Sequence, residues 1–217
     1  MDKPRNRFKL LCLTIFAAAF GYIEAGVVVY LRAIIYPEGF SFPLKNIPQN
    51  LLATEIYREI ATLIVLFTLA MLAKHRLFKR LAFFLYAFAV WDIFYYIWLK
   101  VLINWPSSLL DWDVLFLIPC VWSSPVLSPV IISMTIIAWS QVLLFVGKKT
   151  GKPRMTGAQI SLLLLSGALM LASFFWNAPV IARQQAPVSY PWAMLIAAEI
   201  LSFSALYSFL KSAKATP

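Results

Sequence analysis

The 217-residue sequence has very few charged side chains. Charged residues make up 13% of the chain and hydrophobic residues 62%, whereas an average soluble domain carries about 25% charged residues. A soluble fold of this length still exposes about a quarter to a third of its surface to water, so it could not hide so much apolar surface. The scarcity of charge therefore excludes a soluble globular protein and predicts a chain that is embedded in lipid.

Histidine and cysteine are also scarce. The one histidine, His75, stands in the basic run KHRLFKR, so a histidine-based metal or haem site within the membrane is excluded. The chain contains no Walker loop and no GxSxG, HExxH, DxDxDG or CxxC motif. With His75 as the only histidine, no Ser/His/Asp or Cys/His catalytic set can be assembled. Cys12 falls near the start of the first apolar stretch and Cys120 after the third, so we expect them at opposite faces of the bilayer and unpaired.

Six apolar stretches are long enough to cross a bilayer, which needs about 20 residues. They predict an all-α, polytopic integral membrane protein in which residues 1–217 form a single transmembrane domain. The first stretch continues past the small-residue run AAA, so we expect an uncleaved helix rather than a secretory signal. The predicted transmembrane helices cover residues 10–33, 51–72, 81–103, 125–146, 157–176 and 192–210.

Basic residues mark one side of the predicted bundle. Of the 19 Lys and Arg residues, 14 lie before the first helix, after the last, or in the short connections 73–80 and 147–156. The positive-inside rule therefore predicts that both termini are cytoplasmic. The formal charge of +10 is then a topology signal, so we expect membrane lipids and no nucleic acid as partners. Compact loops fit a bacterial inner membrane, and the oligomeric state stays open.

The outer connections, 37–50, 104–124 and 177–191, are longer and rich in proline. They favour an outward-facing site and tight caps over the helix ends about equally. Within the second connection, VLFLIPCVW (114–122) is too short to span, so we expect a re-entrant or interfacial segment with no regular helix through Pro119. Five tryptophans near the outer boundary predict an interfacial aromatic belt. They are Trp105, Trp112, Trp122, Trp176 and Trp192.

Charged side chains inside the predicted spans are the strongest functional signal, because each costs roughly 2.5–3.5 kcal/mol or more at the bilayer centre. The rise of a helix, about 1.5 Å per residue, places four acidic residues towards the midplane and four charged residues closer to the outer boundary. The deeper residues are Glu24, Glu59, Asp92 and Glu199, and the shallower ones are Arg32, Glu55, Arg58 and Lys100. This pattern predicts a cavity with carboxylates near the midplane and most of the cations nearer the outer boundary.

Helical spacing predicts that these side chains converge. In the first helix, Ala17, Gly21, Glu24 and Ala25 share a face of mostly small residues, which lets helices pack closely and turns Glu24 into the bundle. Three further helices present polar faces with i,i+3 and i,i+4 spacing. These faces are Glu55, Arg58, Glu59 and Thr62; Asp92, Tyr96 and Lys100; and Glu199 with Ser202.

Ion pairing alone is a structural alternative to a functional site. Pairs such as Glu24 with Arg58, or Asp92 with Lys100, would lock the bundle without a ligand. However, the five carboxylates and three cations of the spans leave two negative charges unmatched. Either some carboxylates are protonated, or a cation or cationic ligand completes the set. No cofactor or metal site is predicted, although oxygen ligands leave a hard divalent cation open.

Three functions fit this pattern. The leading hypothesis is an enzyme that takes a lipid-like or isoprenoid substrate from the outer leaflet and uses a carboxylate as general acid or base. The alternatives are a proton- or cation-coupled transporter of a small solute, and an accessory subunit of a membrane complex. The candidate catalytic residues are Glu24, Glu59 and Asp92. The candidate substrate-binding residues are Arg32, Glu55, Arg58, Tyr96, Lys100 and Glu199, whose cations would hold an anionic head group.

Overall fold

The computed structural model describes residues 3–72, 77–145 and 155–215, and most of the residues in these ranges are helical. The six long helices are α1 (Lys3–Ile35), α2 (Gln49–Met71), α3 (Leu77–Ile103), α4 (Leu127–Phe145), α5 (Gly157–Phe175) and α7 (Trp192–Ala215). A single turn, α6 (Ala178–Ile181), and the strands β1 (Trp112–Phe116) and β2 (Trp122–Pro125) lie between them. The all-α architecture is confirmed, and each predicted helix coincides with an observed one, the first and last of which extend further.

Within the described ranges, five helices are long and apolar enough to cross a membrane. α2 is the exception, because every 18-residue window of its 23 residues contains Glu55, Arg58 and Glu59. Its length, about 35 Å, nevertheless matches the roughly 30 Å hydrocarbon core. Charge rather than length therefore separates α2 from the other long helices, and the fold is consistent with an integral helical membrane protein.

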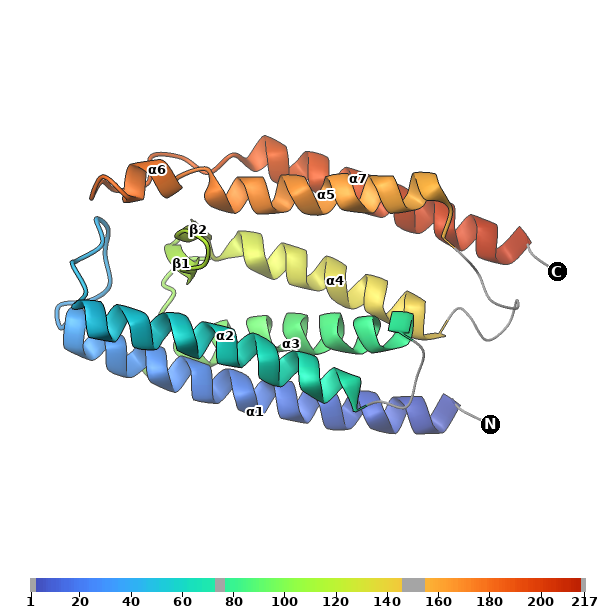
Figure 1. Cartoon of the computed structure of the whole chain (residues 1–217), viewed down its shortest axis with the longest axis horizontal. Coiled ribbons are helices and arrows are strands. Elements are labelled where there is room, and N and C mark those ends of the chain that lie inside the picture. The colour runs from blue at the N-terminus through green and yellow to red at the C-terminus, as the bar shows by residue number, and fades with distance from the viewer. Residues whose placement is uncertain (1–2, 73–76, 146–154, 216–217) are drawn as a thin grey trace.

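The long helices run roughly parallel in three groups (Figure 1). α1, α2 and α3 lie on one side of the bundle, α5 and α7 on the other, and α4 between them. α1 and α4 both pack along α3, α2 packs on α3, and α5 packs along α7. The N-terminal and C-terminal ends lie at one end of the bundle, whereas β1, β2 and α6 lie at the opposite end (Figure 1). A shared end for both termini is the arrangement expected for an even number of crossings.

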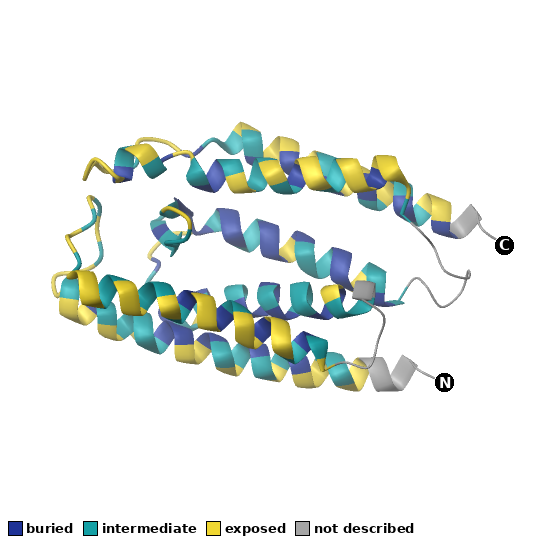
Figure 2. Cartoon of the chain, viewed as in Figure 1, coloured by how far each residue is buried: buried dark blue, intermediate teal, exposed yellow. Residues whose placement is uncertain are grey.

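The main apolar core fills the half of the bundle next to the termini. Buried residues lie mainly on the helix faces turned toward neighbouring helices, and exposed residues lie mainly on the outward faces (Figure 2). Many of the exposed residues are large and apolar, including Ile15, Phe67 and Tyr207, which suits contact with lipid rather than water. The core itself contains Leu13, Ala17, Leu66, Ala70, Ala82, Phe83, Ala87, Val90, Trp91 and Leu144. Among the described residues, the buried charged side chains, those of Glu24, Arg32, Glu59 and Asp113, lie in the opposite half.

Helices α1 and α3 approach each other closely at Gly21. A Cβ atom at this position would lie 3.1 Å from the carbonyl oxygen of Trp91 and 3.2 Å from the amide nitrogen of Tyr95. Ala17 and Ala25, on the same face of α1, are fully buried. The predicted small-residue face is therefore confirmed, and it is what lets the two backbones come together.

We expect Gly21→Val to destabilise the protein by about 1–3 kcal/mol, because backbone atoms of α3 can make room only if the whole helix moves. Gly26→Val is the matched control, since no atom outside its own turn lies within 4 Å of a Cβ at that position. Both changes alter helix propensity equally. Thermal melts in detergent should show a lower midpoint for Gly21→Val alone, and equal midpoints would contradict close packing of α1 on α3.

The segment between α3 and α4 forms an antiparallel hairpin. β1 pairs with β2, with Asp113 opposite Ser124, and no helix passes through Pro119, as predicted. Proline lacks the amide hydrogen that a regular helix or ladder would need there. The two strands were not expected from the sequence, because the apolar run 114–122 has no clear alternation. The hairpin covers the end of the bundle where the polar residues gather.

Candidate functional site

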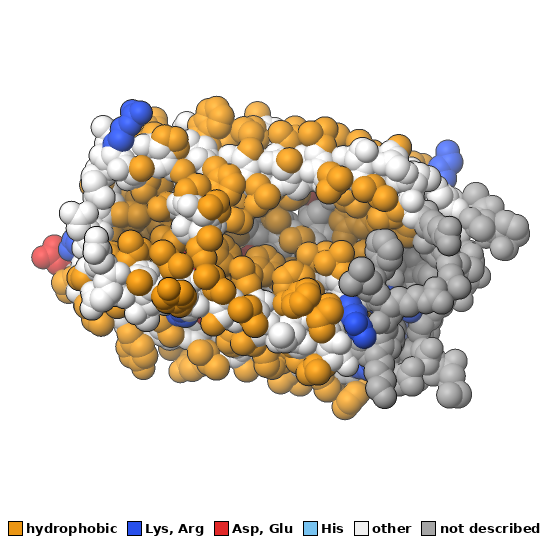
Figure 3. Space-filling model, viewed as in Figure 1, with side chains coloured by type: hydrophobic (Ala, Val, Ile, Leu, Met, Phe, Trp, Pro, Cys, Tyr) orange, Lys and Arg blue, Asp and Glu red, His pale blue; other side chains and the backbone are white. Residues whose placement is uncertain are grey.

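A cavity of about 660 Å³ occupies the half of the bundle that lies away from the termini. Its walls come from α1 to α5, the loop after α1, the hairpin and α6. Most of the lining side chains are apolar, and Figure 3 shows the molecular surface hollowed between α2 and α5, with hydrophobic side chains around the opening. The volume lies within the range of about 300–1,000 Å³ that is typical of small-molecule sites.

Arg58 ties α1 and α2 together beside the cavity. Its Nε donates to Oε1 of Glu55 at 2.8 Å, and its Nη1 pairs with Oε2 of Glu24. The hydroxyl of Thr62 donates to the other oxygen of Glu24. The predicted Glu24–Arg58 pair is therefore present. One guanidinium serves two carboxylates, so the three ionised groups together carry a net negative charge.

Arg32 and Asp113 form a second ion pair near the outer end of the cavity. Nη2 of Arg32 donates to Oδ1 of Asp113 at 2.9 Å, and the two residues are only 9% and 2% exposed. The guanidinium carbon lies 3.8 Å from the ring centre of Trp105 and 4.5 Å from that of Phe40, within cation–π range. Burial raises the pKa of Asp113, and the positive charge of Arg32 opposes that rise. This pair is neutral overall when both groups are ionised.

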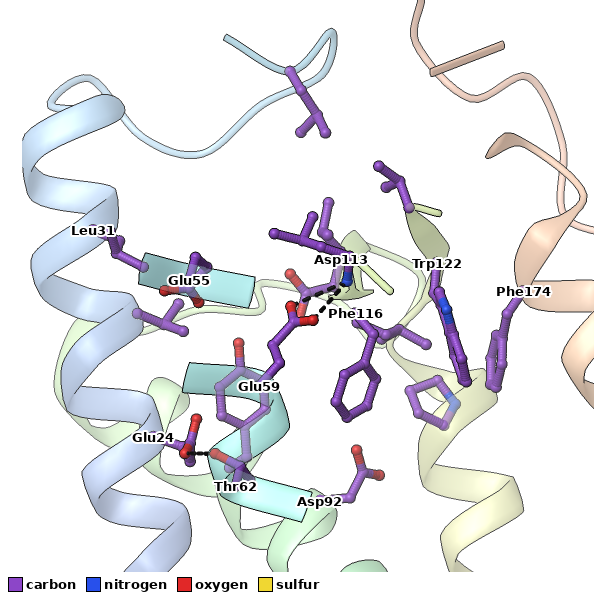
Figure 4. A pocket seen from close by; sticks show the side chains of 18 of the residues that line it. Glu24, Leu31, Glu55, Glu59, Thr62, Asp92, Asp113, Phe116, Trp122 and Phe174 are labelled. Carbon is purple, nitrogen blue, oxygen red and sulfur yellow. Dashed lines mark hydrogen bonds between the residues drawn. The ribbon is translucent and has the colours of Figure 1, made fainter. Parts of the chain in front are cut away.

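Glu59 and Asp92 are held by neutral donors instead of cations. The amide of Leu117, in the hairpin, donates to the two oxygens of Glu59 at 3.1 and 2.9 Å. The hydroxyl of Ser133, on α4, donates to Oδ2 of Asp92 at 2.8 Å. Among the described residues, neither carboxylate forms an ion pair. Figure 4 shows the carboxyl group of Glu59 directed at the hairpin close to Asp113, and that of Asp92 below the ring of Phe116.

A strip of aromatic rings crosses the cavity wall from α3 through the hairpin to α5. Ring centres of Trp91 and Phe116 are 6.4 Å apart, those of Phe116 and Trp122 are 5.3 Å apart, and those of Trp122 and Phe174 are 6.0 Å apart. Such a surface can hold an apolar chain, and its ring faces can also attract a cation.

The cavity brings together seven of the nine sequence-predicted site residues. Tyr96 is one of them, and its ring lies 6.4 Å from that of Trp105. The seven are Glu24, Arg32, Glu55, Arg58, Glu59, Asp92 and Tyr96. The sequence prediction of convergence on one place therefore matches the geometry for all but two residues, and their roles in binding or catalysis stay predictions.

Lys100 does not line the cavity. It is exposed at the end of α3, where its Nζ donates to the carbonyl oxygen of Pro106 at 2.9 Å and, at 3.4 Å, to that of Asn104. The Asp92–Lys100 pair considered from the sequence does not form, because the two residues lie eight positions apart on one helix, about 12 Å along its axis. Lys100 caps backbone carbonyls near the loop that follows α3.

Glu199 also lies apart from the cavity. Thr135, on α4, donates to its Oε2 at 2.7 Å, and the residue borders a separate groove formed mainly by α7. Ser133 and Thr135 are two positions apart, so they project from α4 about 200° from each other. Glu199 and Asp92 are therefore bound to opposite faces of the same helix.

Sequence reasoning missed Asp113 and Ser133. Asp113 gave a usable signal, since it stands between two aromatic-rich segments in the run DWDVLF, but its buried position follows from the hairpin. Ser133 gave none, because a single hydroxyl is common in membrane helices. The aromatic-belt prediction also needs correction: Trp105 covers Arg32 and Trp122 lines the cavity, whereas Trp176, 57% exposed, still fits a belt.

No group of three or more His, Cys, Asp or Glu side chains in the described part of the chain could hold a metal ion. Cys12 and Cys120 are both free and exposed, which confirms that they do not pair. A hard cation bound by fewer protein oxygens stays an untested alternative.

The chemistry of the cavity is the basis for assigning a function. Its distinguishing features are an apolar wall, two ion-paired arginines, and two carboxylates that form no ion pair within the described ranges. The chain matches no protein-family model, no curated protein and no solved structure.

Proposed function

We propose that the protein is a membrane-embedded enzyme that binds a lipid-like substrate in the cavity and uses Asp92 as general acid or base. The observation that carries this proposal is the environment of Asp92, a cavity-lining carboxylate held by the hydroxyl of Ser133 at 2.8 Å. A carboxylate that is not committed to a cation can give or take a proton beside a bound substrate. We place the enzyme in a bacterial inner membrane.

Glu24 and Glu59 fit supporting roles better than the catalytic role. Glu24 is already bound by Arg58 and Thr62, so it helps to fix α2 against α1. Glu59 accepts two contacts from the Leu117 amide, so it holds the hairpin over the cavity. Asp92 keeps one oxygen outside its hydrogen bond with Ser133, and that oxygen is the proposed proton donor or acceptor.

The opening between α2 and α5 supports a lipid-like substrate. It lies along the sides of spanning-length helices, where lipid would surround the protein, and its rim is apolar (Figure 3). An amphiphile could therefore enter sideways from the membrane with its chain against the aromatic strip. A water-soluble solute would gain little from such a wall.

Close apolar packing in the half of the bundle next to the termini favours an enzyme over a transporter. A carrier needs access to its site from both sides of the membrane, yet apolar side chains of α1 to α4 pack together beneath the cavity. An accessory subunit would need only ion pairs, and Glu59 and Asp92 take part in none among the described residues. The first observation supports a site that is open on one side, and the second supports a site that does more than lock the bundle.

We further propose six crossings, with the hairpin outside and both termini in the cytoplasm. Cys120 is exposed at the hairpin end, so a polar maleimide added to intact cells should label the wild type there. Cys120→Ser should abolish that labelling, and Lys211→Cys in that background should react only after the membrane is opened. Labelling of Lys211→Cys in sealed cells would reverse the orientation.

Filling the cavity tests whether it holds a ligand. Gly167 lines the cavity, and no atom outside its own helical turn lies within 4 Å of a Cβ there, so Gly167→Phe should place a ring in the empty space without a clash. Native mass spectrometry of protein extracted from its membrane should show a bound amphiphile in the wild type and none in Gly167→Phe. Gly26→Phe, on the outer side of α1, should keep the ligand. Equal lipid content in all three would reject a cavity-bound substrate.

A further inference from the structure

Resting on the function proposed above, we infer that the substrate carries a positively charged head group, such as an ammonium, rather than a phosphate. This differs from the sequence-based expectation that Arg32, Arg58 and Lys100 hold an anionic head group. Two properties of the cavity favour a cation: its arginines are already ion-paired with carboxylates, and aromatic rings lie beside the carboxylates that form no ion pair within the described residues.

Acidic groups outnumber basic groups around the cavity. Eight charged side chains line it, five of them acidic and three basic. The acidic ones are Glu24, Glu55, Glu59, Asp92 and Asp113, and the basic ones are Arg32, Lys45 and Arg58. If all were ionised, the lining would carry a net charge of 3 − 5 = −2. In a low-dielectric site this excess attracts a cation and repels an anion.

None of the three basic groups is available deep in the cavity. Arg32 is bound to Asp113, and Arg58 is bound to Glu24 and Glu55. Lys45 is exposed at the rim, where its Nζ lies 5.3 Å from the ring centre of Tyr36. A phosphate would therefore meet arginines that are already neutralised by carboxylates, and it would have to displace those carboxylates to bind.

The unmatched carboxylates are placed to receive a cation. Glu59 and Asp92 both line the cavity and are hydrogen-bonded only by an amide and a hydroxyl within the described residues. Their carboxyl groups lie above and below the ring of Phe116 in the view of Figure 4. The rings of Trp91 and Trp122 flank Phe116. Carboxylates together with aromatic faces are the groups that recognise ammonium ions.

The same combination already holds a cation elsewhere in the cavity. The guanidinium of Arg32 is bound by a carboxylate, Asp113, and covered by the rings of Phe40 and Trp105. The fold thus stabilises one internal cation by the chemistry that we assign to the substrate site. The apolar chain of the substrate would then lie along Trp122, Phe174 and the opening between α2 and α5.

Three probes with the same chain and different heads test the inference: dodecylamine, dodecanol and dodecyl phosphate. Binding to the purified protein in an uncharged maltoside detergent is measured by native mass spectrometry, and by quenching of tryptophan fluorescence where the probe causes it. We expect dodecylamine, a cation at pH 7, to bind at least tenfold more tightly than dodecanol, and dodecyl phosphate to bind most weakly. Probe binding that remains in Gly167→Phe takes place outside the cavity, and it is subtracted from the binding measured for the other proteins.

Two variants assign the preference to the cavity. Asp92→Asn should reduce the amine-over-alcohol preference at least threefold while leaving dodecanol binding unchanged. Glu199→Gln, which neutralises a carboxylate outside the cavity, should leave the preference as in the wild type. Equal binding of amine and alcohol, or tighter binding of the phosphate, overturns the cationic head group but leaves the cavity as a lipid site. Failure of every probe to bind beyond the Gly167→Phe background counts against the proposed function itself.

Discussion

Asp92→Asn is expected to abolish the activity of the protein while leaving its stability almost unchanged. Asparagine keeps the volume of the side chain and can still accept the hydrogen bond from Ser133. No cation is stranded, because Asp92 forms no ion pair among the described residues. Loss of a general acid or base costs about 10²–10⁴-fold in rate. Complementation of a deletion strain, read from its membrane lipid profile, measures the activity, and a thermal melt measures the stability.

Glu199→Gln is the matched control for that experiment. Glu199 also accepts a hydrogen bond from a hydroxyl on α4, that of Thr135, but it lies outside the cavity. We expect it to complement the deletion as well as the wild type does. An Asp92→Asn protein that is destabilised yet fully active would defeat the catalytic assignment and favour the accessory-subunit hypothesis. A variant of Glu199 that loses activity would show that the site extends to α7.

Arg58→Met should produce a large loss of stability. It leaves the carboxylates of Glu24 and Glu55 without their shared counterion, and Glu24 is only 4% exposed. Breaking a buried ion pair by removing one partner costs about 3–5 kcal/mol. Because Arg58 retains 23% side-chain exposure, we expect the lower end of that range, or a fall of roughly 10 °C in the melting midpoint.

Two comparisons separate charge from volume in that result. Lys45→Met removes a cation from the exposed rim and should lower the free energy of unfolding by less than about 1 kcal/mol. The triple variant Glu24→Gln, Glu55→Gln, Arg58→Met removes all three charges and should recover most of the lost stability, because no buried charge is left unpaired. A triple variant as unstable as Arg58→Met alone would show that packing, not charge, is what Arg58 provides.

The sequence determined the helices and the half of the bundle that carries polar groups. Each apolar stretch is a property of its own residues, so the predicted bounds lie within about two residues of those of α2, α4 and α5, whereas α1, α3 and α7 extend further. The small-residue face of α1 likewise follows from a local period of 3.6 residues. The Glu24–Arg58 pair could be anticipated because opposite charges inside the membrane pair by default and both residues stand on inward-facing polar faces of neighbouring helices.

Only the tertiary structure decided which polar groups meet. Asp92 pairs with Ser133 and not with Lys100, since its neighbour comes from α4 and not from its own helix. Glu199 lies on the far side of α4, where Thr135 donates a hydrogen bond to it. Asp113 reaches Arg32 because the hairpin folds back over the bundle. Hydropathy is summed along one segment, whereas a hydrogen-bond partner depends on the rotation and neighbours of every helix, which are fixed when the whole bundle packs.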